Sequence, residues 1–250
     1  MILQIEQLTR HYGGVRAVDG VSCSVEEGSV TALIGPNGAG KTTLLNVASG
    51  VTPPSSGRVL FGGTDITGER ADDICRAGIA RTFQTPQLFP TMSVLENVLV
   101  GATPRGHINL IESALHLPRA AREEVQLRAE AIELLHGLGL PQLADAAVGT
   151  LPFGLQRRVE VARALASHPK LVMMDEPASG LSRAETEELR ALVATIAGRG
   201  ITVLLVEHNM RLVMSIASRV LVLDKGKLLA AGSPAEVQAN REVQRAYLGS

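Results

Sequence analysis

The 250-residue chain has no tryptophan and only six aromatic residues, two tyrosines and four phenylalanines. So few rings cannot form the stacked aromatic platform on which single-stranded nucleic acids bind. The formal net charge is −1, so the chain also lacks the broad positive field that attracts nucleic-acid backbones. The sequence therefore predicts no nucleic-acid partner.

Cysteines are scarce, and long apolar runs are missing. Cys23 and Cys75 lie far apart and match no metal-ligand spacing, which favours two reduced thiols over a disulfide. No stretch approaches the roughly 20 apolar residues of a membrane span, and the first ten residues lack the positively charged start of a signal peptide. We therefore expect a membrane role only through a partner.

Short apolar runs that alternate with helical patterns make up much of the chain. Val30–Ile34 is a continuous apolar run, as expected of a strand buried on both faces. Strands alternating with helices predict an α/β fold with a parallel sheet. The expected strands are Leu3–Leu8, part of Val15–Val25, Val30–Ile34, Arg58–Phe61, Leu171–Met174, Thr202–Val206, Arg219–Asp224 and Leu228–Ala231. The expected core helices are Thr42–Ser49, Ala184–Ala197 and one starting at Met210.

Residues 85–151 have a helical pattern and predict an inserted helical subdomain. Ser93 is the expected cap of a helix through Val100, with Glu96 completing a capping box. Ile108–Leu117 is expected to form another helix. A further helix is predicted from an apolar stripe that consists of Val125, Ala129, Ile132 and Leu135.

The segment Gly35–Thr42 matches G-x-x-x-x-G-K-[ST] and lies between an expected strand and an expected helix. Its glycines allow successive backbone N–H groups to point inward around a phosphate. Lys41 would carry positive charge to the β- and γ-phosphates, and the Thr42 hydroxyl can bind Mg²⁺. A glycine-rich turn with an unrelated lysine is the alternative. The motif predicts nucleotide binding without indicating the reaction.

Asp175 and Glu176 follow the apolar run LVMM, at the end of an expected strand. Asp175 would reach Mg²⁺ bound at the phosphate loop on a neighbouring strand, and Glu176 would polarise an attacking water. An acidic turn after a strand is the alternative. Together with the phosphate loop, the pair favours hydrolysis over transfer to an acceptor.

Five motifs occur in the order found in one family of ATPases. They are GPNGAGKTT, Gln84 after an apolar strand, LPFGLQ before a basic helix, LVMMDEP, and His208 after Thr202–Val206. With these motifs the chain resembles the ATPase subunits of ABC transporters over essentially its whole length. The resemblance implies a single domain, with residues 1–84 and 152–250 forming a RecA-like P-loop core and an N-terminal antiparallel β subdomain. Residues 85–151 would form the helical subdomain.

The resemblance also implies roles for individual residues. Tyr12 would stack on adenine, Gln84 would ligate Mg²⁺ or its water, and His208 would bind the γ-phosphate. A surface tyrosine, a loop amide and a buried histidine are the respective alternatives. The nucleotide would be bound by Tyr12, Gly35, Pro36, Asn37, Gly38, Ala39, Gly40, Lys41, Thr42 and Thr43, and Mg²⁺ by Thr42, Gln84 and Asp175. Glu176 and His208 would be catalytic.

The signature segment would bind ATP that is held by a second ATPase subunit. It consists of Leu151, Pro152, Phe153, Gly154, Leu155 and Gln156. Pro152 replaces the family's usual serine, and Leu155 stands where glutamine is common. Ser182, in the loop Ser179–Ser182 expected at the dimer interface, replaces an acidic residue. The backbone around Gly154 would therefore carry phosphate recognition.

The resemblance is greatest to ATPases of branched-chain amino acid importers, through RTFQTPQLFPTMSVLENVLVG, QRRVEVARAL and RAYLG. ATPases of urea or amide importers and of lipopolysaccharide export are similar. The implied partners are integral membrane permease subunits and an identical or similar second ATPase, at the cytoplasmic face of the membrane. A soluble ABC ATPase acting on ribosomes or DNA is the alternative, as is a P-loop kinase or GTPase. No N-K-x-D motif supports a GTPase.

Overall fold

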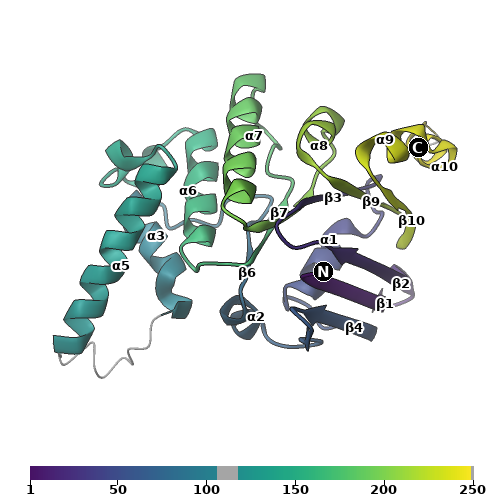
Figure 1. The fold of residues 1–250 in the computed structure, drawn as a ribbon, viewed down its shortest axis with the longest axis horizontal. Coiled ribbons are helices and arrows are strands. Elements are labelled where there is room, and N and C mark those ends of the chain that lie inside the picture. Colours follow the sequence, from purple (N-terminus) through teal and green to yellow (C-terminus); the bar gives the residue numbers. More distant parts are fainter. Residues whose placement is uncertain (106–117, 249–250) are drawn as a thin grey trace. The chain divides into compact units, whose positions relative to one another are not determined.

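The computed structural model of the chain describes residues 1–105 and 118–248. Its elements, drawn as a ribbon in Figure 1, form two compact units. Unit 1 contains Met1–Gln84 and Lys170–Ser250, and unit 2 contains Thr85–Pro169. The helix expected at 108–117 lies outside the described residues.

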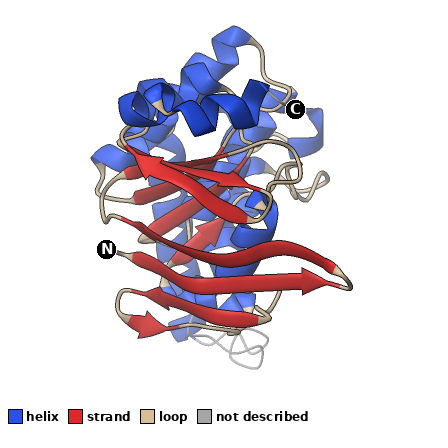
Figure 2. Cartoon of the chain, turned by 90° about the vertical axis from the view of Figure 1, so that its right-hand side faces the viewer, coloured by secondary structure: helices blue, strands red, loops and turns tan. Residues whose placement is uncertain are grey.

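The first sheet of unit 1 is antiparallel, with strand order β2-β1-β4-β5. Its strands are β1 (Leu3–Tyr12), β2 (Val15–Val25), β4 (Ser56–Phe61) and β5 (Thr64–Asp65). The turn at Gly62-Gly63 joins β4 to β5. This sheet confirms the N-terminal antiparallel β subdomain and is drawn in red with the second sheet in Figure 2.

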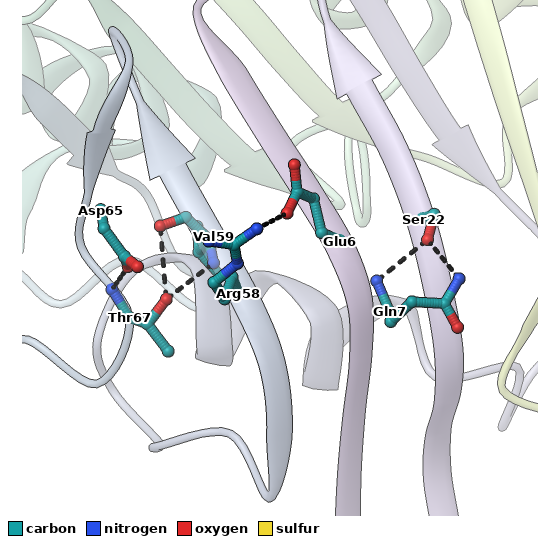
Figure 3. A network of polar contacts seen from close by, with 7 residues as sticks. All are labelled: Glu6, Gln7, Ser22, Arg58, Val59, Asp65 and Thr67. Atoms are coloured by element: carbon teal, nitrogen blue, oxygen red, sulfur yellow. Dashed lines mark hydrogen bonds and ion pairs between the residues drawn. The ribbon is translucent and has the colours of Figure 1, made fainter.

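The two faces of the antiparallel sheet differ in polarity. Leu3, Ile5 and Leu8 of β1 are buried in the core. Polar side chains on and beside the sheet pair with one another instead (Figure 3). Glu6 accepts from Arg58 (2.7 Å) and Ser22 accepts from Gln7 (2.9 Å), while the Asp65 carboxylate accepts from the backbone N–H of Thr67 (2.9 Å). This alternation explains why the N-terminal strands were readable from the sequence.

The second sheet of unit 1 is mostly parallel, with strand order β10-β9-β3-β8-β7-β6. Its strands are β3 (Val30–Ile34), β6 (Ile79–Arg81), β7 (Leu171–Asp175), β8 (Thr202–Val206), β9 (Arg219–Asp224) and β10 (Lys227–Gly232). All neighbouring pairs are parallel except β9 and β10, which form a hairpin. The predicted α/β fold with a mostly parallel sheet is confirmed.

Apolar side chains cover both faces of the mostly parallel sheet. Leu33 lies in a core cluster shared with α1 and the antiparallel sheet, whereas Ala32 and Ile34 lie in a cluster shared with α8, α9 and α10. The helices of unit 1 are α1 (Lys41–Ala48), α2 (Ala71–Ala77), α7 (Arg183–Gly198), α8 (Met210–Ile216), α9 (Pro234–Ala239) and α10 (Arg241–Leu248). Because β3 is buried on both faces, its sequence is continuously apolar.

One detail of the predicted sheet was wrong. From the sequence, Asp175 was expected on a strand next to the one that precedes the phosphate loop. In the structure β8 lies between β3 and β7. Sequence order alone does not give strand order, because each crossover can skip a position. The carboxyl ends of all three parallel strands still meet at one edge of the sheet, where α/β proteins bind their ligands.

Unit 2 consists of helices. They are α3 (Val94–Ala102), η1 (Thr103–Arg105), α5 (Pro118–Gly137), η2 (Pro141–Leu143), η3 (Val148–Thr150) and α6 (Phe153–Leu165). The predicted capping box at the start of α3 is present: Ser93 accepts from the backbone of Glu96, whose carboxylate accepts from the backbone of Ser93. In the described ranges, no helix combines the length and apolarity needed to cross a bilayer.

Residues 152–169 group with unit 2, although the sequence analysis assigned them to the core. The reason is close packing of α6 on α3. A Cβ at Gly101 of α3 would lie 2.0 Å from the carbonyl oxygen of Arg163 on α6. The two helix backbones therefore approach more closely than any residue other than glycine would allow.

The apolar stripe predicted for α5 is correct at Leu135, which is buried, and wrong at Val125, Ala129 and Ile132, which are exposed. Val125 is 70% exposed and Ile132 is 39% exposed, whereas Ala131 and Leu135 are buried. The packed face is therefore rotated from the expected stripe by about one residue. Val125 and Ile132 remain as exposed apolar side chains of unit 2.

Candidate active site

The phosphate loop connects β3 to α1 and is held between two other strands of unit 1. A Cβ at Gly35 would lie 2.2 Å from the carbonyl oxygen of Leu223, and one at Gly40 would lie 2.2 Å from that of Ala17. Gly40 also has φ +99 and is the N-cap of α1. Both positions therefore require glycine, for reasons of space and of backbone conformation.

Lys41 is the first residue of α1 and is only 6% exposed. Its Nζ donates hydrogen bonds to the carbonyl oxygens of Gly35 (2.8 Å) and Pro36 (3.0 Å). Burial lowers the pKa of Lys41, and the carboxylates of Glu176 and Asp175 act in the opposite direction. The amine is therefore held inside the loop, in the electrostatic range of both acidic residues. Thr42, on the first turn of α1, is exposed.

Asp175 is the last residue of β7 and is 4% exposed. Its Oδ2 accepts a hydrogen bond from Nη2 of Arg81 at 3.1 Å. Burial raises the pKa of Asp175, and the Arg81 guanidinium opposes that rise. A carboxylate at this place is positioned at the sheet edge where the phosphate loop begins.

Glu176 directly follows β7 and has φ +47, which is unusual for a residue other than glycine. Its backbone N–H donates to the carbonyl oxygen of Val206 at 2.9 Å, so β8 holds the turn. Its Oε2 accepts from Nε2 of Gln84 at 2.9 Å and lies 3.9 Å from Nδ1 of His208. The structure thus brings together three residues that the sequence analysis assigned to the site. Strained backbone of this kind occurs disproportionately at functional sites.

Glu207 organises the loops beside these residues, a role that the sequence analysis missed. It is fully buried. Its carboxylate accepts backbone N–H donors from Ala178 at 2.7 Å, His208 at 3.1 Å and Asn209 at 3.2 Å. Glu207 thereby ties the segment after β8 to the segment after β7. A glutamate at the end of a strand gives no sequence signal for a bond to a residue 29 positions away.

Ser182 has a structural role that the sequence analysis did not assign. It is the N-cap of α7: its hydroxyl accepts from the backbone of Glu185, and the Glu185 carboxylate accepts from the backbone of Ser182. The sequence S-x-x-E is the signature of such a capping box, so the signal was available. Serine at this position is therefore explained by the start of α7.

Tyr12 ends β1 and is 44% exposed. The guanidinium carbon of Arg10 lies 4.7 Å from the centre of its ring, so a cation covers one face. Tyr12 and Ala17 belong to the same hairpin, β1–β2, and Ala17 contacts the phosphate loop at Gly40. Stacking on adenine remains a prediction for this residue.

The signature segment lies in unit 2 at the start of α6. Pro152 is the N-cap and makes no side-chain cap bond; its carbonyl oxygen accepts from the N–H groups of Leu155 and Gln156, both at 3.0 Å. The Gln156 side chain donates to the carbonyl oxygen of Leu151 at 2.9 Å. The N-terminus of this 13-residue helix provides backbone N–H groups and the positive end of the helix dipole.

A cavity of about 280 Å³ lies beside the phosphate loop. Its lining consists of Pro36, Asn37, Gly38, Ala39, Asp224, Lys225, Arg245 and Ala246. The last two belong to α10, which the sequence analysis did not predict as an element. Burial raises the pKa of Tyr247 on the same helix, and a hydrogen bond with the backbone of Gly35 acts in the opposite direction. The C-terminal helix thus contacts the phosphate loop.

The residues predicted to hold Mg²⁺ can be tested against the donor groups present. Within the ranges that the structure describes, no three His, Cys, Asp or Glu side chains form a cluster that could hold a metal alone. Mg²⁺ at nucleotide sites does not need such a cluster, because one or two carboxylates, water and the phosphates supply its oxygen ligands. A single buried carboxylate beside a phosphate loop, as Asp175 provides, fits that requirement.

Comparison with known proteins agrees with this fold. The family model described as ABC transporter matches residues 18–179, and the model described as branched-chain amino acid ATP-binding cassette transporter matches residues 227–250. The chain therefore belongs to the ABC transporter family, as an ATP-binding subunit with ATPase activity.

Similar proteins and structures span the whole chain. The high-affinity branched-chain amino acid transport ATP-binding protein BraF of Pseudomonas aeruginosa is 41% identical, covering 99% of this chain and 98% of the relative. The high-affinity branched-chain amino acid transport ATP-binding protein LivG of Escherichia coli K12 is 38% identical, covering 99% of this chain and 98% of the relative. A nucleotide-free ATP-binding cassette from an ABC transporter superposes with a TM-score of 0.87 at 35% identity, covering 100% of this chain and 99% of the other. The cassette MJ1267 in its ADP conformation matches equally well.

Proposed function

We propose that this chain is the ATP-hydrolysing subunit of an importer of branched-chain amino acids. The single observation that carries this proposal is the 41% identity to a branched-chain amino acid transport ATP-binding protein over 99% of the chain. The match of residues 227–250 to a branched-chain amino acid cassette model supports it independently. The chain would act at the cytoplasmic face of the membrane, bound to integral permease subunits that carry the solute.

The phosphate loop would bind the β- and γ-phosphates of ATP. Its backbone N–H groups and the N-terminus of α1 supply donors, and Lys41 supplies charge from inside the loop. Asp175, Thr42 and Gln84 would hold Mg²⁺, which neutralises charge on the phosphates when it is bound. For Lys41 to reach a phosphate, its amine exchanges the carbonyl oxygens of Gly35 and Pro36 for phosphate oxygens.

Glu176 would act as the base that orients and deprotonates the attacking water. Three contacts hold it for this role: its backbone bond to Val206, the amide of Gln84 on Oε2, and the imidazole of His208 near the same oxygen. His208, whose side chain is 61% exposed, is accessible to a γ-phosphate. A base needs its carboxylate within hydrogen-bond reach of the water, so a fixed Glu176 is the main requirement.

Two such subunits would close on two ATP molecules. The signature segment of one subunit would bind the γ-phosphate of ATP held by the other. Since Pro152 has no hydroxyl and no N–H, this contact would rest on the backbone near Gly154 and on the N-terminus of α6. A dimeric bacterial ABC transporter cassette of the same fold is known, at 25% identity and a TM-score of 0.77. ATP would thus join the two half-sites, and hydrolysis would separate them.

The proposal is tested by solute uptake in cells that lack this chain and have no redundant system. Cells complemented with the wild-type chain should take up leucine, isoleucine and valine, and cells complemented with Glu176→Gln should not. Glu187→Gln provides a matched control, because Glu187 is an exposed glutamate of α7 that pairs only locally with Arg190. Unchanged uptake of all three amino acids in the deletion strain would exclude this substrate class.

Copurification distinguishes the proposal from other ATPases of the family. Membrane extraction with a tagged chain should recover integral membrane proteins in a stoichiometric complex. Recovery with ribosomes, in the absence of any membrane protein, would instead support a soluble ABC ATPase. Recovery with a permease whose deletion changes urea uptake or the outer membrane's lipopolysaccharide would assign the chain to one of those transporters.

A further inference from the structure

Arg81 connects two parts of the nucleotide site. It ends β6, pairs with Met173 of β7, and its side chain is only 7% exposed. Its Nη2 donates to Oδ2 of Asp175 at 3.1 Å, and its Nη1 donates to Oγ of Ser49 at 2.9 Å. These two bonds fix the plane of the guanidinium.

Ser49 is itself held in place at the end of the helix that starts from the phosphate loop. It is buried and is the C-cap of α1, and its hydroxyl donates to the carbonyl oxygen of Leu45 at 2.7 Å. The hydroxyl can therefore only accept from Arg81. As a result, the far end of α1, Arg81 and Asp175 form one chain of hydrogen bonds.

The chain of bonds leaves the two oxygens of Asp175 inequivalent. Among the described residues, Arg81 is the only side chain that donates to this carboxylate, and it donates to Oδ2. Oδ1 has no such donor. A planar, permanently charged guanidinium fixes the orientation of a buried carboxylate more strictly than a lysine ammonium would.

Divalent cations differ in how they use a carboxylate. Ca²⁺ accepts both oxygens of one carboxylate and tolerates variable geometry, whereas Mg²⁺ demands near-octahedral geometry and keeps several waters. We propose that Arg81 is a positioning residue that sets the metal specificity of the nucleotide site: by binding Oδ2 it disfavours coordination of a cation by both oxygens of Asp175, and thereby favours Mg²⁺ over Ca²⁺. This inference rests on the proposed function, in which Asp175 serves the metal of the nucleotide.

The test is metal-dependent binding of a fluorescent, non-hydrolysable ATP analogue to the purified chain. Mg²⁺ and Ca²⁺ are titrated separately, and the ratio of their half-saturating concentrations is measured. Arg81→Gln removes the donor to Oδ2, Arg81→Lys keeps the charge without the two-pronged geometry, and Ser49→Ala removes the anchor of Arg81. Arg58→Gln is the control, because Arg58 forms an exposed ion pair with Glu6 on the antiparallel sheet of the same unit.

In both Arg81 variants we expect the half-saturating concentration of Ca²⁺ to fall about tenfold relative to that of Mg²⁺. A change of this size is typical when a residue that orients a metal ligand is lost. Ser49→Ala should shift the ratio less, in the same direction, and Arg58→Gln should leave it unchanged. Should the Arg81 variants fail to fold, Ser49→Ala still decides the question because it removes a single hydroxyl. The inference would be overturned if Arg81→Lys and Ser49→Ala melt at the wild-type temperature and keep the wild-type ratio of half-saturating Mg²⁺ and Ca²⁺ concentrations.

Asp175→Asn separates this inference from the proposed function. If Asp175→Asn leaves the metal requirement for analogue binding unchanged, Asp175 does not serve the metal and that part of the proposed function fails. If Asp175→Asn raises the requirement for Mg²⁺ while the Arg81 and Ser49 variants keep the wild-type ratio, only the role of Arg81 fails.

Discussion

Gln84 donates a hydrogen bond of 2.9 Å to Glu176 across a sequence separation of 92 residues. Gln84 is the last residue of unit 1 before the chain enters unit 2, and Glu176 is the residue proposed to activate water. The amide therefore holds the carboxylate of Glu176 from the position where the chain leaves the core. Any rearrangement that withdraws Gln84 would remove one of the three contacts that hold Glu176.

Gln84→Ala should lower the rate of ATP hydrolysis by a larger factor than it weakens nucleotide binding. The carboxylate loses the donor on Oε2, and a small misplacement of a reacting group costs up to about 100-fold in rate. Steady-state hydrolysis and equilibrium binding of a nucleotide analogue measure the two effects. Gln87→Ala is the control, because the Gln87 side chain donates only to the nearby carbonyl oxygen of Thr85. Equal loss of hydrolysis in both variants would contradict a specific role for Gln84.

Glu207→Ala should destabilise the protein by about 3 kcal/mol, since it leaves buried N–H donors without their charged acceptor. Glu207→Gln keeps one acceptor oxygen and should cost less. Urea unfolding gives both free energies, with exposed Glu6→Gln as the control. If Glu207→Ala and the wild type have the same midpoint of urea unfolding, the three hydrogen bonds to Glu207 do not hold these loops.

Gly40→Ala should abolish nucleotide binding, because its Cβ would lie 2.2 Å from the carbonyl oxygen of Ala17 and its φ of +99 disfavours alanine. Gly198→Ala is the control with free space. Gly198 is the last residue of α7, and a Cβ added there would have no atom within 4 Å. That variant should keep wild-type binding and gain up to about 1 kcal/mol of stability. Isothermal titration with a nucleotide and thermal melting measure both. Retained binding in Gly40→Ala would contradict the tight seating of the phosphate loop.

The capping boxes predict an acid dependence of stability. Hydrogen bonds from the side chain and backbone of Ser182 lower the pKa of Glu185 below its ordinary 4.5. Because the folded-state pKa is depressed, the ionised carboxylate stabilises the folded protein above about pH 4.5, and this contribution disappears as the pH falls through the folded-state pKa. Urea unfolding between pH 3 and 6 should therefore show a shallower pH slope for Glu185→Gln than for wild type. Identical slopes would show that the capping bond does not persist in solution.

The phosphate loop and the pair Asp175–Glu176 could be located from the sequence because each is a contiguous motif next to a strand. The expected α/β fold followed from short apolar runs in the same way, whereas the antiparallel sheet was expected from the family resemblance. Strand order did not follow, since it depends on crossovers, and β8 separates the two strands assumed to be neighbours.

Contacts between distant segments were the features that the sequence could not predict. In the sequence, nothing distinguishes Arg81 from any other polar residue at the end of a strand. Likewise, Glu207 is only an acidic residue next to His208. Their roles depend on Ser49 and Asp175 in one case and on Ala178 in the other. The face of α5 was misassigned for a different reason: apolar residues outside the predicted stripe, such as Leu127 and Ala131, allow a second stripe, and only packing selects the one that is buried.

Single-turnover hydrolysis by Glu176→Gln tests the central claim most directly. A general base contributes about 100-fold to 10,000-fold to a rate. Relative to wild type and to Glu187→Gln, the variant should therefore bind ATP with similar affinity and hydrolyse it at least about 100-fold more slowly. Hydrolysis by Glu176→Gln at the wild-type rate would contradict the assignment of Glu176 and the mechanism built on it.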